Sequence, residues 1–238
     1  MKVLAFIPAR SGSKSIDNKN MALLGGEHLI TYCIEAVKRS SITDIICSTD
    51  NEPIANLARR KGLTVLDRPR HLAKDDTPVS KVISHFIRNH YQQDEVRHDA
   101  IALVQPTSPF LTPYQIEACI KMLSDNPDMM SVQTICRVPH NFHAWNQRIL
   151  SKKERTVEWA YPQREWAINK QAKPALFKFG NLVVTRLCAL DRGDIFAKPS
   201  GGIETSIWDS IDVDTQDDLD LANALVETGH LGLWKREL

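Results

Sequence analysis

Short apolar runs alternate with amphipathic segments along the first part of the chain, and this alternation restricts the possible folds more than any other feature. Each run has the length of one buried strand, and the runs lie at residues 3–6, 45–47, 63–66 and 101–104. The segments between them repeat apolar residues at helical spacing. Strands that alternate with helices build right-handed crossover units around a mostly parallel sheet. The sequence therefore predicts an α/β fold.

Capping residues mark the helix starts. Thr112 precedes a proline at the expected first helical position, and Thr215 is followed three residues later by Asp218. We expect Asp50 to cap the helix that follows the second apolar run. Near the carboxyl end, the apolar residues of 207–213 indicate another short strand.

Polar and charged residues are concentrated in the loops that follow the predicted strands. These loops lie at residues 8–20, 48–50, 67–77 and 105–111. In a parallel sheet, the carboxyl ends of the strands meet at one edge, and ligands bind beyond it. We therefore expect the functional site along this edge.

The loop after the first strand combines basic side chains with small residues. It reads Ile-Pro-Ala-Arg-Ser-Gly-Ser-Lys at residues 7–14, and Lys19 and Asn20 follow. Arg10 offers a planar fork for phosphate oxygens, whereas Lys14 and Lys19 offer compact positive charge. Exposed backbone N–H groups complete an anion site of this kind. A solvated basic turn is the alternative, but the position at the end of an amino-terminal strand favours a nucleotide site.

Asp212 and Asp214 are the second strong feature. On an extended segment, alternate residues point to the same side, so we expect both carboxylates to face one way. Two carboxylates at this spacing, just before a helix, suit a Mg²⁺ ion. In the alternative interpretation, Asp214 helps the helix to start and Asp212 is solvated. The phosphate-type loop at the other end of the chain favours the metal site.

Other polar residues on these loops are weaker candidates. Arg68 and Asp75, in a long loop between strand and helix, can bind a base or ribose, and Gln105 at a strand tip can bind a sugar hydroxyl. An ordinary turn is an equal alternative for this loop. His140 and His143 have a spacing seen in metal sites but no obvious further ligand, so we expect substrate contact or packing.

Composition excludes several classes of protein. The 238 residues include 30 basic and 29 acidic ones, and the net charge of +1 does not fit bulk electrostatic binding of nucleic acid. No apolar run approaches the roughly 20 residues of a membrane span, and no signal peptide is visible. The 5 cysteines form no C-x-x-C pair, which is typical of reduced, packed cysteines. We therefore expect a cytoplasmic protein.

Three common motifs are missing from the sequence. No G-x-G-x-x-G follows the first strand, which disfavours a dinucleotide-binding dehydrogenase, and no G-x-x-x-x-G-K-[ST] occurs, which disfavours a Walker-type ATPase. The absence of G-x-S-x-G excludes the nucleophile-elbow hydrolases.

Residues 138–176 interrupt the regular pattern. They are rich in His, Trp, Asn, Arg and Lys, and their apolar residues have no clean period. We expect an inserted arm here, built around a hairpin, between core segments at 1–137 and 177–238.

Taken in order, these blocks resemble the signature motifs of the acylneuraminate cytidylyltransferases, the CMP-sialic acid synthetases. The loop at residues 7–14, with Lys19-Asn20, carries the strongest likeness. The further matching blocks follow in the family's order and cover most of the chain: Ser48-Thr49-Asp50, Arg68-Pro69, Leu72-Ala73-x-Asp75-x-Thr77, Gln105-Pro106-Thr107-Ser108-Pro109 and Ile211-Asp212-Val213-Asp214.

The resemblance implies a Rossmann-like three-layer α/β sandwich of the nucleotide-diphospho-sugar transferase type, with a small dimerisation arm at 138–176. Members of the family transfer CMP from CTP to the anomeric hydroxyl of a nonulosonic, sialic-acid-like keto sugar acid, with Mg²⁺, and release pyrophosphate. The implied partners are CTP, a keto sugar acid and a second copy of the chain, with no nucleic acid and no membrane.

The resemblance also assigns roles to residues. Those placed at the nucleotide are Arg10, Ser13, Lys14, Lys19, Asn20, Arg68 and Asp75. Arg10, Lys19 and Asp214 would act in catalysis by neutralising charge that develops on the phosphates. Asp212 and Asp214 would bind the metal. Those placed at the sugar acid are Gln105 and, from the arm, His140 and Arg164.

Alternatives stay open at this point. A related nucleotidyltransferase that uses Kdo or a sugar phosphate is one, and a catalytically inactive nucleotide-binding homologue is another. The arm has Gln163-Arg164-Glu165 where the family has an Arg-Arg-Gln cluster. Acceptors other than N-acetylneuraminate, such as legionaminic, pseudaminic or deaminated relatives, are therefore open as well.

Overall fold

The structure is a computed structural model that describes residues 1–12, 15–89, 98–165, 169–190 and 193–229. In this part of the chain, a seven-stranded sheet has the strand order β11-β7-β10-β6-β1-β4-β5. In chain order, its strands are β1 (Val3–Pro8), β4 (Asp44–Thr49), β5 (Thr64–Asp67), β6 (Ala100–Val104), β7 (Ser131–Arg137), β10 (Phe177–Arg186) and β11 (Ser200–Thr205).

Parallel pairing dominates the sheet. β1 lies between β4 and β6 and is parallel to both, β4 is parallel to β5, and β11 is parallel to β7. β10 runs antiparallel to both of its neighbours, β6 and β7. The predicted α/β fold with a mostly parallel sheet is therefore confirmed. The strand order reverses at β1, and such a reversal marks the place where ligands bind in open α/β sheets.

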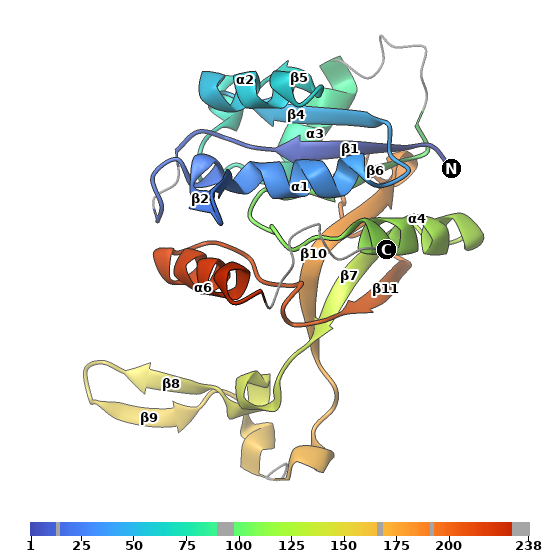
Figure 1. Ribbon diagram of the computed structural model, residues 1–238. Helices are drawn as coiled ribbons and strands as arrows, with labels where there is room; N and C mark the ends of the chain where they lie inside the picture. Colours follow the sequence, from blue (N-terminus) through green and yellow to red (C-terminus); the bar gives the residue numbers. More distant parts are fainter. Residues whose placement is uncertain (13–14, 90–97, 166–168, 191–192, 230–238) are drawn as a thin grey trace.

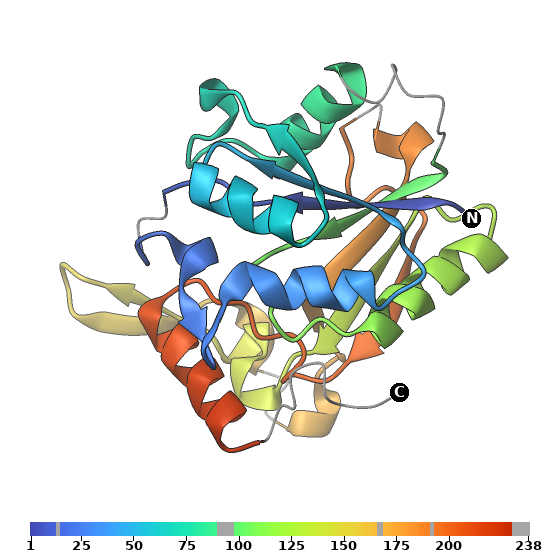
Figure 2. The same ribbon diagram turned by 45° about the horizontal axis from the view of Figure 1, so that its top comes forward.

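Helices cover both faces of the sheet (Figure 1, Figure 2). One face carries α1 (Leu29–Lys38), α2 (Glu52–Arg60) and α4 (Pro113–Asp125). The other carries α3 (Val79–Asn89) and α5 (Leu187–Leu190). Each face of the sheet packs an apolar core against its helices, and alternate residues of β1 point into the two cores. Val3, Ala5 and Ile7 lie in the core with α1, α2 and α4, and Leu4 and Phe6 lie in the core with α3 and α5. A strand buried on both faces reads as a continuous apolar run, which is what the sequence shows.

A third apolar cluster joins the two ends of the chain. α6 (Gln216–Glu227) buries Leu219 and Ala222 in a cluster with Tyr32 of α1 and Leu24. Leu24 belongs to a small antiparallel pair that follows the first loop, formed by β2 (Leu23–Leu24) and β3 (Glu27–His28). This packing holds the carboxyl-terminal segment beside the amino-terminal loop.

Two of the predicted helix caps are confirmed. The Thr112 hydroxyl accepts the Gln115 N–H at 3.3 Å while Gln115 Oε1 accepts the Thr112 N–H at 3.0 Å. The Thr215 hydroxyl accepts the Asp218 N–H at 3.3 Å, and Asp218 Oδ2 accepts the Thr215 N–H at 2.8 Å. Both are reciprocal capping boxes, so α4 and α6 start where the sequence predicts.

The predicted cap at Asp50 is wrong. Asn51 caps α2 instead, because its Oδ1 accepts the Ile54 N–H at 3.1 Å. The carboxylate of Asp50 is engaged elsewhere, since its Oδ1 accepts the Ser11 N–H at 2.7 Å. Asp50 therefore forms a tertiary contact with the amino-terminal loop in place of the helix cap that its local sequence predicts.

The strand predicted at 207–213 is also wrong. Residues 207–210 form a turn, and the strand of this region, β11 (Ser200–Thr205), lies upstream. Gly201 and Gly202 give β11 a low β-propensity, which hides it in the sequence. Both glycines lie close to side chains of neighbouring elements, so a Cβ at either position would approach a neighbouring atom within 3.0 Å.

The segment between β7 and β10 forms an arm that extends away from the sheet (Figure 1). Its hairpin consists of β8 (Arg148–Ser151) and β9 (Thr156–Trp159), which pair antiparallel. Short 3-10 turns flank the hairpin: η4 (His140–Phe142), η5 (Ala144–Asn146), η6 (Pro162–Glu165) and η7 (Lys170–Ala172).

None of the helices in the described ranges has both the length and the apolar character that crossing a membrane requires. The cysteines of these ranges carry free thiols, as the sequence predicts. The buried ones are Cys33, Cys47, Cys119 and Cys136, whereas Cys188 is exposed. Burial raises the pKa of the Cys47 thiol to about 12, so this thiol is protonated and inert at neutral pH.

Candidate active site

A cleft of about 330 Å³ opens beyond the carboxyl ends of β1 and β6. It is lined by four segments that are far apart in the sequence: the loop after β1, the stretch 68–82, the loop after β6 and the segment before α6. Its polar and charged lining side chains are those of Arg10, Lys19, Asn20, Arg68, Thr77, Gln105, Thr107, Asp212 and Asp214. The cleft therefore lies along the edge at which the sequence places the site.

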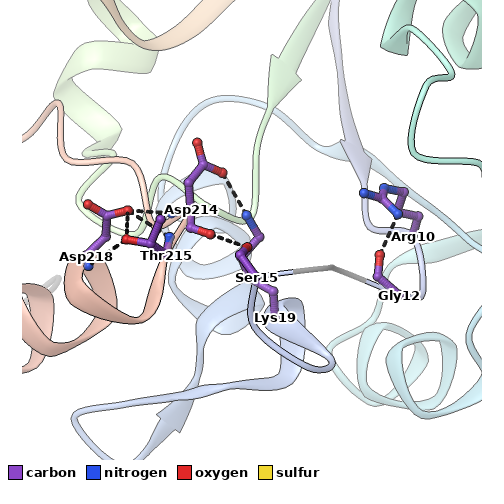
Figure 3. Close-up of polar contacts among 7 residues, drawn as sticks. All are labelled: Arg10, Gly12, Ser15, Lys19, Asp214, Thr215 and Asp218. Carbon is purple, nitrogen blue, oxygen red and sulfur yellow. Dashed lines mark hydrogen bonds and ion pairs between the residues drawn. The ribbon is translucent and has the colours of Figure 1, made fainter. Parts of the chain in front are cut away.

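Arg10 is held within the amino-terminal loop. Its Nη1 lies 2.6 Å from Asp75 Oδ1 and donates to the Gly12 carbonyl (Figure 3). Asn20 Nδ2 donates to the Arg10 carbonyl at 3.0 Å, which folds the loop back on itself. Gly12 has a φ of +66°, a left-handed conformation that favours glycine. The loop thus presents the Arg10 guanidinium to the cleft on a compact turn.

Two further residues predicted for this loop, Ser13 and Lys14, lie outside the described residues.

Lys19 starts the short helix η1 (Lys19–Met21) and reaches the carboxyl-terminal segment (Figure 3). Its Nζ lies 2.7 Å from Asp214 Oδ1. The Ser15 hydroxyl donates to the main-chain carbonyl of Asp214. The Lys19 side chain is 14 % exposed and that of Asp214 is 68 % exposed, so the ammonium is shielded while the carboxylate stays open to the cleft. The two ends of the chain meet at this ion pair.

The side chains of the carboxylate segment, residues 211–214, alternate between core and cleft as the sequence predicts. Val213 is fully buried, while Asp212 and Asp214 line the cleft. The Val213 N–H donates to the Thr107 carbonyl at 2.8 Å, which ties the segment to the loop after β6. Asp218 Oδ2 accepts the Asp214 N–H at 3.1 Å, so the capping box of α6 also holds this end.

Asp212 lines the cleft and its side chain is open to solvent there. Partial burial raises the pKa of its carboxyl, and the nearby Asp214 carboxylate adds to this rise. A hydrogen bond with Thr107 and the positive charges of Lys19 and Lys178 oppose it. Two close carboxylates that repel each other are stabilised by any cation placed between them.

The donor set of this pair fits a hard divalent cation. Carboxylate oxygens are the ligands such ions prefer, and Mg²⁺ is commonly bound by one or two carboxylates together with substrate phosphates. Within the described ranges, no cluster of three or more His, Cys, Asp or Glu side chains forms a complete protein cage for a metal. A cation held by Asp212 and Asp214 would complete its coordination with oxygens of water or of a bound ligand.

Arg68, directly after β5, is 7 % exposed and lines the inner part of the cleft. Its Nη2 donates to the Ser48 carbonyl at 2.8 Å and its Nε to the Ser48 hydroxyl at 3.3 Å. Burial lowers the pKa of this guanidinium, and the nearby Asp50 carboxylate opposes the shift. Asp50 therefore links the Arg68 region to Ser11 of the amino-terminal loop.

Asp50 and Thr107 lie in loops that the sequence places at the site edge, but the sequence assigns neither of them a role in the site. Each belongs to a polar block at a strand end, Ser48-Thr49-Asp50 or Gln105 to Pro109, and this position was the available signal. Their contacts, with Ser11 and Val213, are long-range. The sequence therefore predicts the edge of the sheet at which the two residues lie, but not their contact partners.

The three residues predicted to bind the acceptor lie in different places. Gln105 lines the cleft at the end of β6. His140 lines a separate hollow of about 290 Å³ at the base of the arm, together with Arg137 and Lys173. The backbone of Arg164 lies in η6, and its side chain is outside the described part of the structure. Within one chain, the cleft and this hollow are lined by different residues.

In a comparison with protein families, the family described as Cytidylyltransferase matches residues 4–182. The chain is 31 % identical over 232 residues to the CMP-N,N'-diacetyllegionaminic acid synthase of Legionella pneumophila subsp. pneumophila strain Philadelphia 1, an alignment that covers 95 % of this chain and 97 % of that protein.

Two N-acylneuraminate cytidylyltransferases are longer than this chain. The protein of Escherichia coli O18:K1:H7 is 34 % identical over 137 residues, which cover 57 % of this chain and 32 % of that protein. The protein of Streptococcus agalactiae serotype III is 25 % identical over 224 residues, which cover 92 % of this chain and 52 % of that protein. The chain thus spans about a third and about half of these relatives.

Solved structures share the fold. A CMP:2-keto-3-deoxy-manno-octonic acid synthetase complexed with CTP superposes with a TM-score of 0.72 at 14 % identity, over 96 % of this chain and 100 % of that one. A 4-diphosphocytidyl-2C-methyl-D-erythritol synthase from Anaerococcus prevotii superposes with a TM-score of 0.60, also at 14 % identity, over 95 % and 96 %. At this identity, the likeness concerns the fold alone.

Proposed function

The chain belongs to the cytidylyltransferase family, as a nucleotidyltransferase of the acylneuraminate type, and we propose that it transfers CMP from CTP to the anomeric hydroxyl of a nonulosonic acid. The hydroxyl oxygen forms a bond to the α-phosphorus, the bond from that phosphorus to the β-phosphate bridge breaks, and pyrophosphate leaves. The family expected from the sequence motifs is confirmed by the family match and by the relatives.

The observation that carries the proposal is the Lys19–Asp214 pair at 2.7 Å, in a cleft that Arg10 also lines. Phosphoryl transfer depends on positioning and on neutralising charge rather than on a protein nucleophile. A site for it needs cations for the phosphates beside carboxylates that bind a metal. This pair places both kinds of group in contact, from opposite ends of the chain.

The residues divide into those that hold the nucleotide and those that face the acceptor. Arg10 and Lys19 would hold the phosphates and stabilise the leaving pyrophosphate. Arg68, in the inner part of the cleft, would lie near the base, and Asn20 would support the loop. Gln105 would hydrogen-bond the sugar acid from the tip of β6.

Asp212 and Asp214 would hold the divalent metal ion that the family typically uses, which we propose to be Mg²⁺. Bound there with the triphosphate, the ion would neutralise phosphate charge and lower the pKa of the attacking hydroxyl. Lys19 contacts only one oxygen of Asp214. The Lys19 ammonium and the ion held by the two carboxylates would then both offset the negative charge of the phosphates.

We also propose that the protein acts as a homodimer through its arm. Leu150 and Val157 are paired across β8 and β9 and are 59 % and 57 % exposed. Trp159, on the same face of the hairpin, is 40 % exposed. An apolar face on a thin, projecting hairpin calls for a covering surface, and a second copy would supply one. The arm would then bring His140 and Arg164 toward the neighbouring cleft.

Pyrophosphate release tests this function directly. The protein is incubated with CTP, Mg²⁺ and one acceptor at a time: N-acetylneuraminate, a legionaminic acid, a pseudaminic acid, a deaminated sialic acid, Kdo or a sugar phosphate. We expect turnover with a nonulosonic acid, and the Legionella relative makes the legionaminic acid the first choice. Turnover with Kdo or a sugar phosphate alone would contradict the proposed acceptor class. CTP binding without turnover on any acceptor would indicate an inactive homologue.

A further inference from the structure

The segment that carries Asp212 and Asp214 has no sheet to hold it. Residues 211–214 form neither strand nor helix, and the turn before them, residues 206–210, connects them to β11. An irregular segment keeps its position only if its backbone groups find donors and acceptors elsewhere. Metal-binding side chains in particular need supporting hydrogen bonds to stay in place.

Asn181 supplies such support from the middle of the sheet. It is fully buried in β10, where the register with β7 shifts between Phe179 and Val183. Its Nδ2 donates to the main-chain carbonyl of Asp209 at 2.8 Å and to Gln115 Oε1 at 3.0 Å. One side-chain amide therefore joins the turn at 206–210 to the start of α4.

The orientation of the Asn181 amide is fixed from the other side. The Thr134 hydroxyl donates to Asn181 Oδ1 at 2.9 Å and accepts the Asn181 N–H at 2.8 Å. Gln115 belongs to the capping box of α4, so it is itself held by Thr112. A fully satisfied buried network of this kind allows little movement.

A second donor from the same strand reaches the next carbonyl of the turn. Lys178 Nζ donates to the Ser210 carbonyl at 2.7 Å. Asn181 and Lys178 thus bind the consecutive carbonyls of Asp209 and Ser210, and Asp212 follows two residues later. Two donors on adjacent carbonyls fix the direction in which the chain enters the carboxylate segment.

We propose that Asn181 is a positioning residue of the transfer reaction, which holds the turn at 206–210 and through it keeps Asp212 and Asp214 opposite the amino-terminal loop. The inference rests on the proposed function for its effect on turnover. Its structural part, that Asn181 fixes the position of the carboxylate segment, does not depend on catalysis. It is tested separately by hydrogen–deuterium exchange.

The test compares Asn181→Ala with Ser131→Ala in the full chain. Ser131 is a matched control because it is also fully buried in the sheet and donates to a main-chain carbonyl, that of Ala197 at 2.8 Å, away from the turn. Hydrogen–deuterium exchange is measured on peptides that cover residues 206–214, and the Mg²⁺ concentration for half-maximal turnover is measured at saturating CTP.

For Asn181→Ala we expect faster exchange at 206–214 and a half-maximal Mg²⁺ concentration raised by about 10-fold, as for loss of a supporting contact in a metal site. CTP binding in EDTA stays unchanged, because Arg10 and Lys19 are untouched. For Ser131→Ala we expect a lower melting temperature with neither change. Wild-type exchange and wild-type Mg²⁺ dependence in folded Asn181→Ala would overturn the proposal.

Two further outcomes are an Asn181→Ala variant that does not fold and a wild-type protein without turnover. If Asn181→Ala does not fold, Asn181→Asp replaces it, because it keeps the shape of the side chain and removes the amide donors to Asp209 and Gln115. Asn181→Asp should then speed exchange at 206–214, and wild-type exchange would count against the proposal. If the wild-type protein turns over no acceptor, the proposed function fails, while the exchange comparison still decides whether Asn181 holds the segment.

Discussion

At the scale of single residues, the site depends on contacts between groups that are distant in sequence. Lys19 and Asp214 are 195 positions apart, yet their charges are in contact. Arg10 is placed by Asp75 and by the carbonyl of Gly12. Arg10 and Lys19 therefore each have a carboxylate partner, which holds the side chain in position until phosphate oxygens compete for it.

Replacing Asp214 separates its chemical role from its structural one. In Asp214→Asn, the carboxylate charge disappears while shape is kept, so we expect turnover to fall by about 100-fold or more. The melting temperature should hardly change, because the Asp214 carboxylate is 68 % exposed and a solvent-screened ion pair contributes only about 0–1 kcal/mol. Asp217→Asn, exposed in the first turn of α6, is the control and should keep wild-type turnover. A wild-type rate for Asp214→Asn would remove this residue from the metal site.

Asp75 touches the nucleotide site through Arg10. In Asp75→Asn, the guanidinium loses an ion pair that fixes its direction, and we expect the KM for CTP to rise about 2- to 5-fold, equivalent to up to about 1 kcal/mol. Asp76→Asn, at the neighbouring position, should leave the KM unchanged. Steady-state kinetics with varied CTP measures both. A fall in KM would mean that Asp75 competes with the phosphates for Arg10.

At the scale of secondary-structure elements, β10 is the strand that connects fold and site. It runs antiparallel within an otherwise parallel sheet, and its irregularity at Gly180 and Asn181 lies beside Asp209, in the turn that precedes the carboxylate segment. The irregular pairing requires close approach of two backbones. A Cβ at position 180 would lie 2.5 Å from Thr134 Oγ1 and 3.0 Å from the Thr134 main-chain carbon.

Gly180→Ala should therefore destabilise the protein. Because Thr134 is buried and hydrogen-bonded, it cannot move away, and we expect a loss of about 1–3 kcal/mol in the free energy of unfolding. In Gly201→Ala, the nearest atom is Met122 Sδ at 2.7 Å, in a flexible side chain, so the loss should be smaller. Urea unfolding of both variants measures the difference, and equal losses would show that Thr134 gives way.

At the scale of the whole molecule, the arm extends away from the α/β core (Figure 1). The cleft is lined by residues of the core. The arm's hairpin is thin, and its two faces differ in what they expose. Leu150 and Val157 lie on one face, and Ile149, which is paired with Glu158, lies on the other. The proposed dimer uses the face of Leu150.

A charged residue on that face should prevent dimerisation. We expect Leu150→Lys to behave as a monomer of about 26.9 kDa in light scattering coupled to gel filtration, because burial of an unpaired ammonium in an apolar interface is costly. Ile149→Lys is the control, since Ile149 is 61 % exposed on the opposite face. It should keep twice the monomer mass. A wild-type chain that is monomeric by the same measurement would contradict the proposed dimer.

The sequence by itself determined the α/β class, the edge that carries the site and the starts of α4 and α6. These features depend on periodicity and on contacts between near neighbours, such as the capping boxes of Thr112 and Thr215. Local preference predicted the wrong helix cap at Asp50, which contacts Ser11 instead. It also failed to predict β11, because the glycines of that strand are required by close packing against neighbouring elements.

Only the tertiary structure decided how the site is assembled. Lys19 forms an ion pair with Asp214, and Asn181 donates a hydrogen bond to the turn at 206–210. No local sequence pattern relates the residues of either contact. Such contacts form because packing of the apolar cluster around Tyr32 and Leu219 brings the two ends of the chain together. Apolar burial has no direction, so the sequence shows which residues are buried, whereas the three-dimensional packing decides which polar groups they bring into contact.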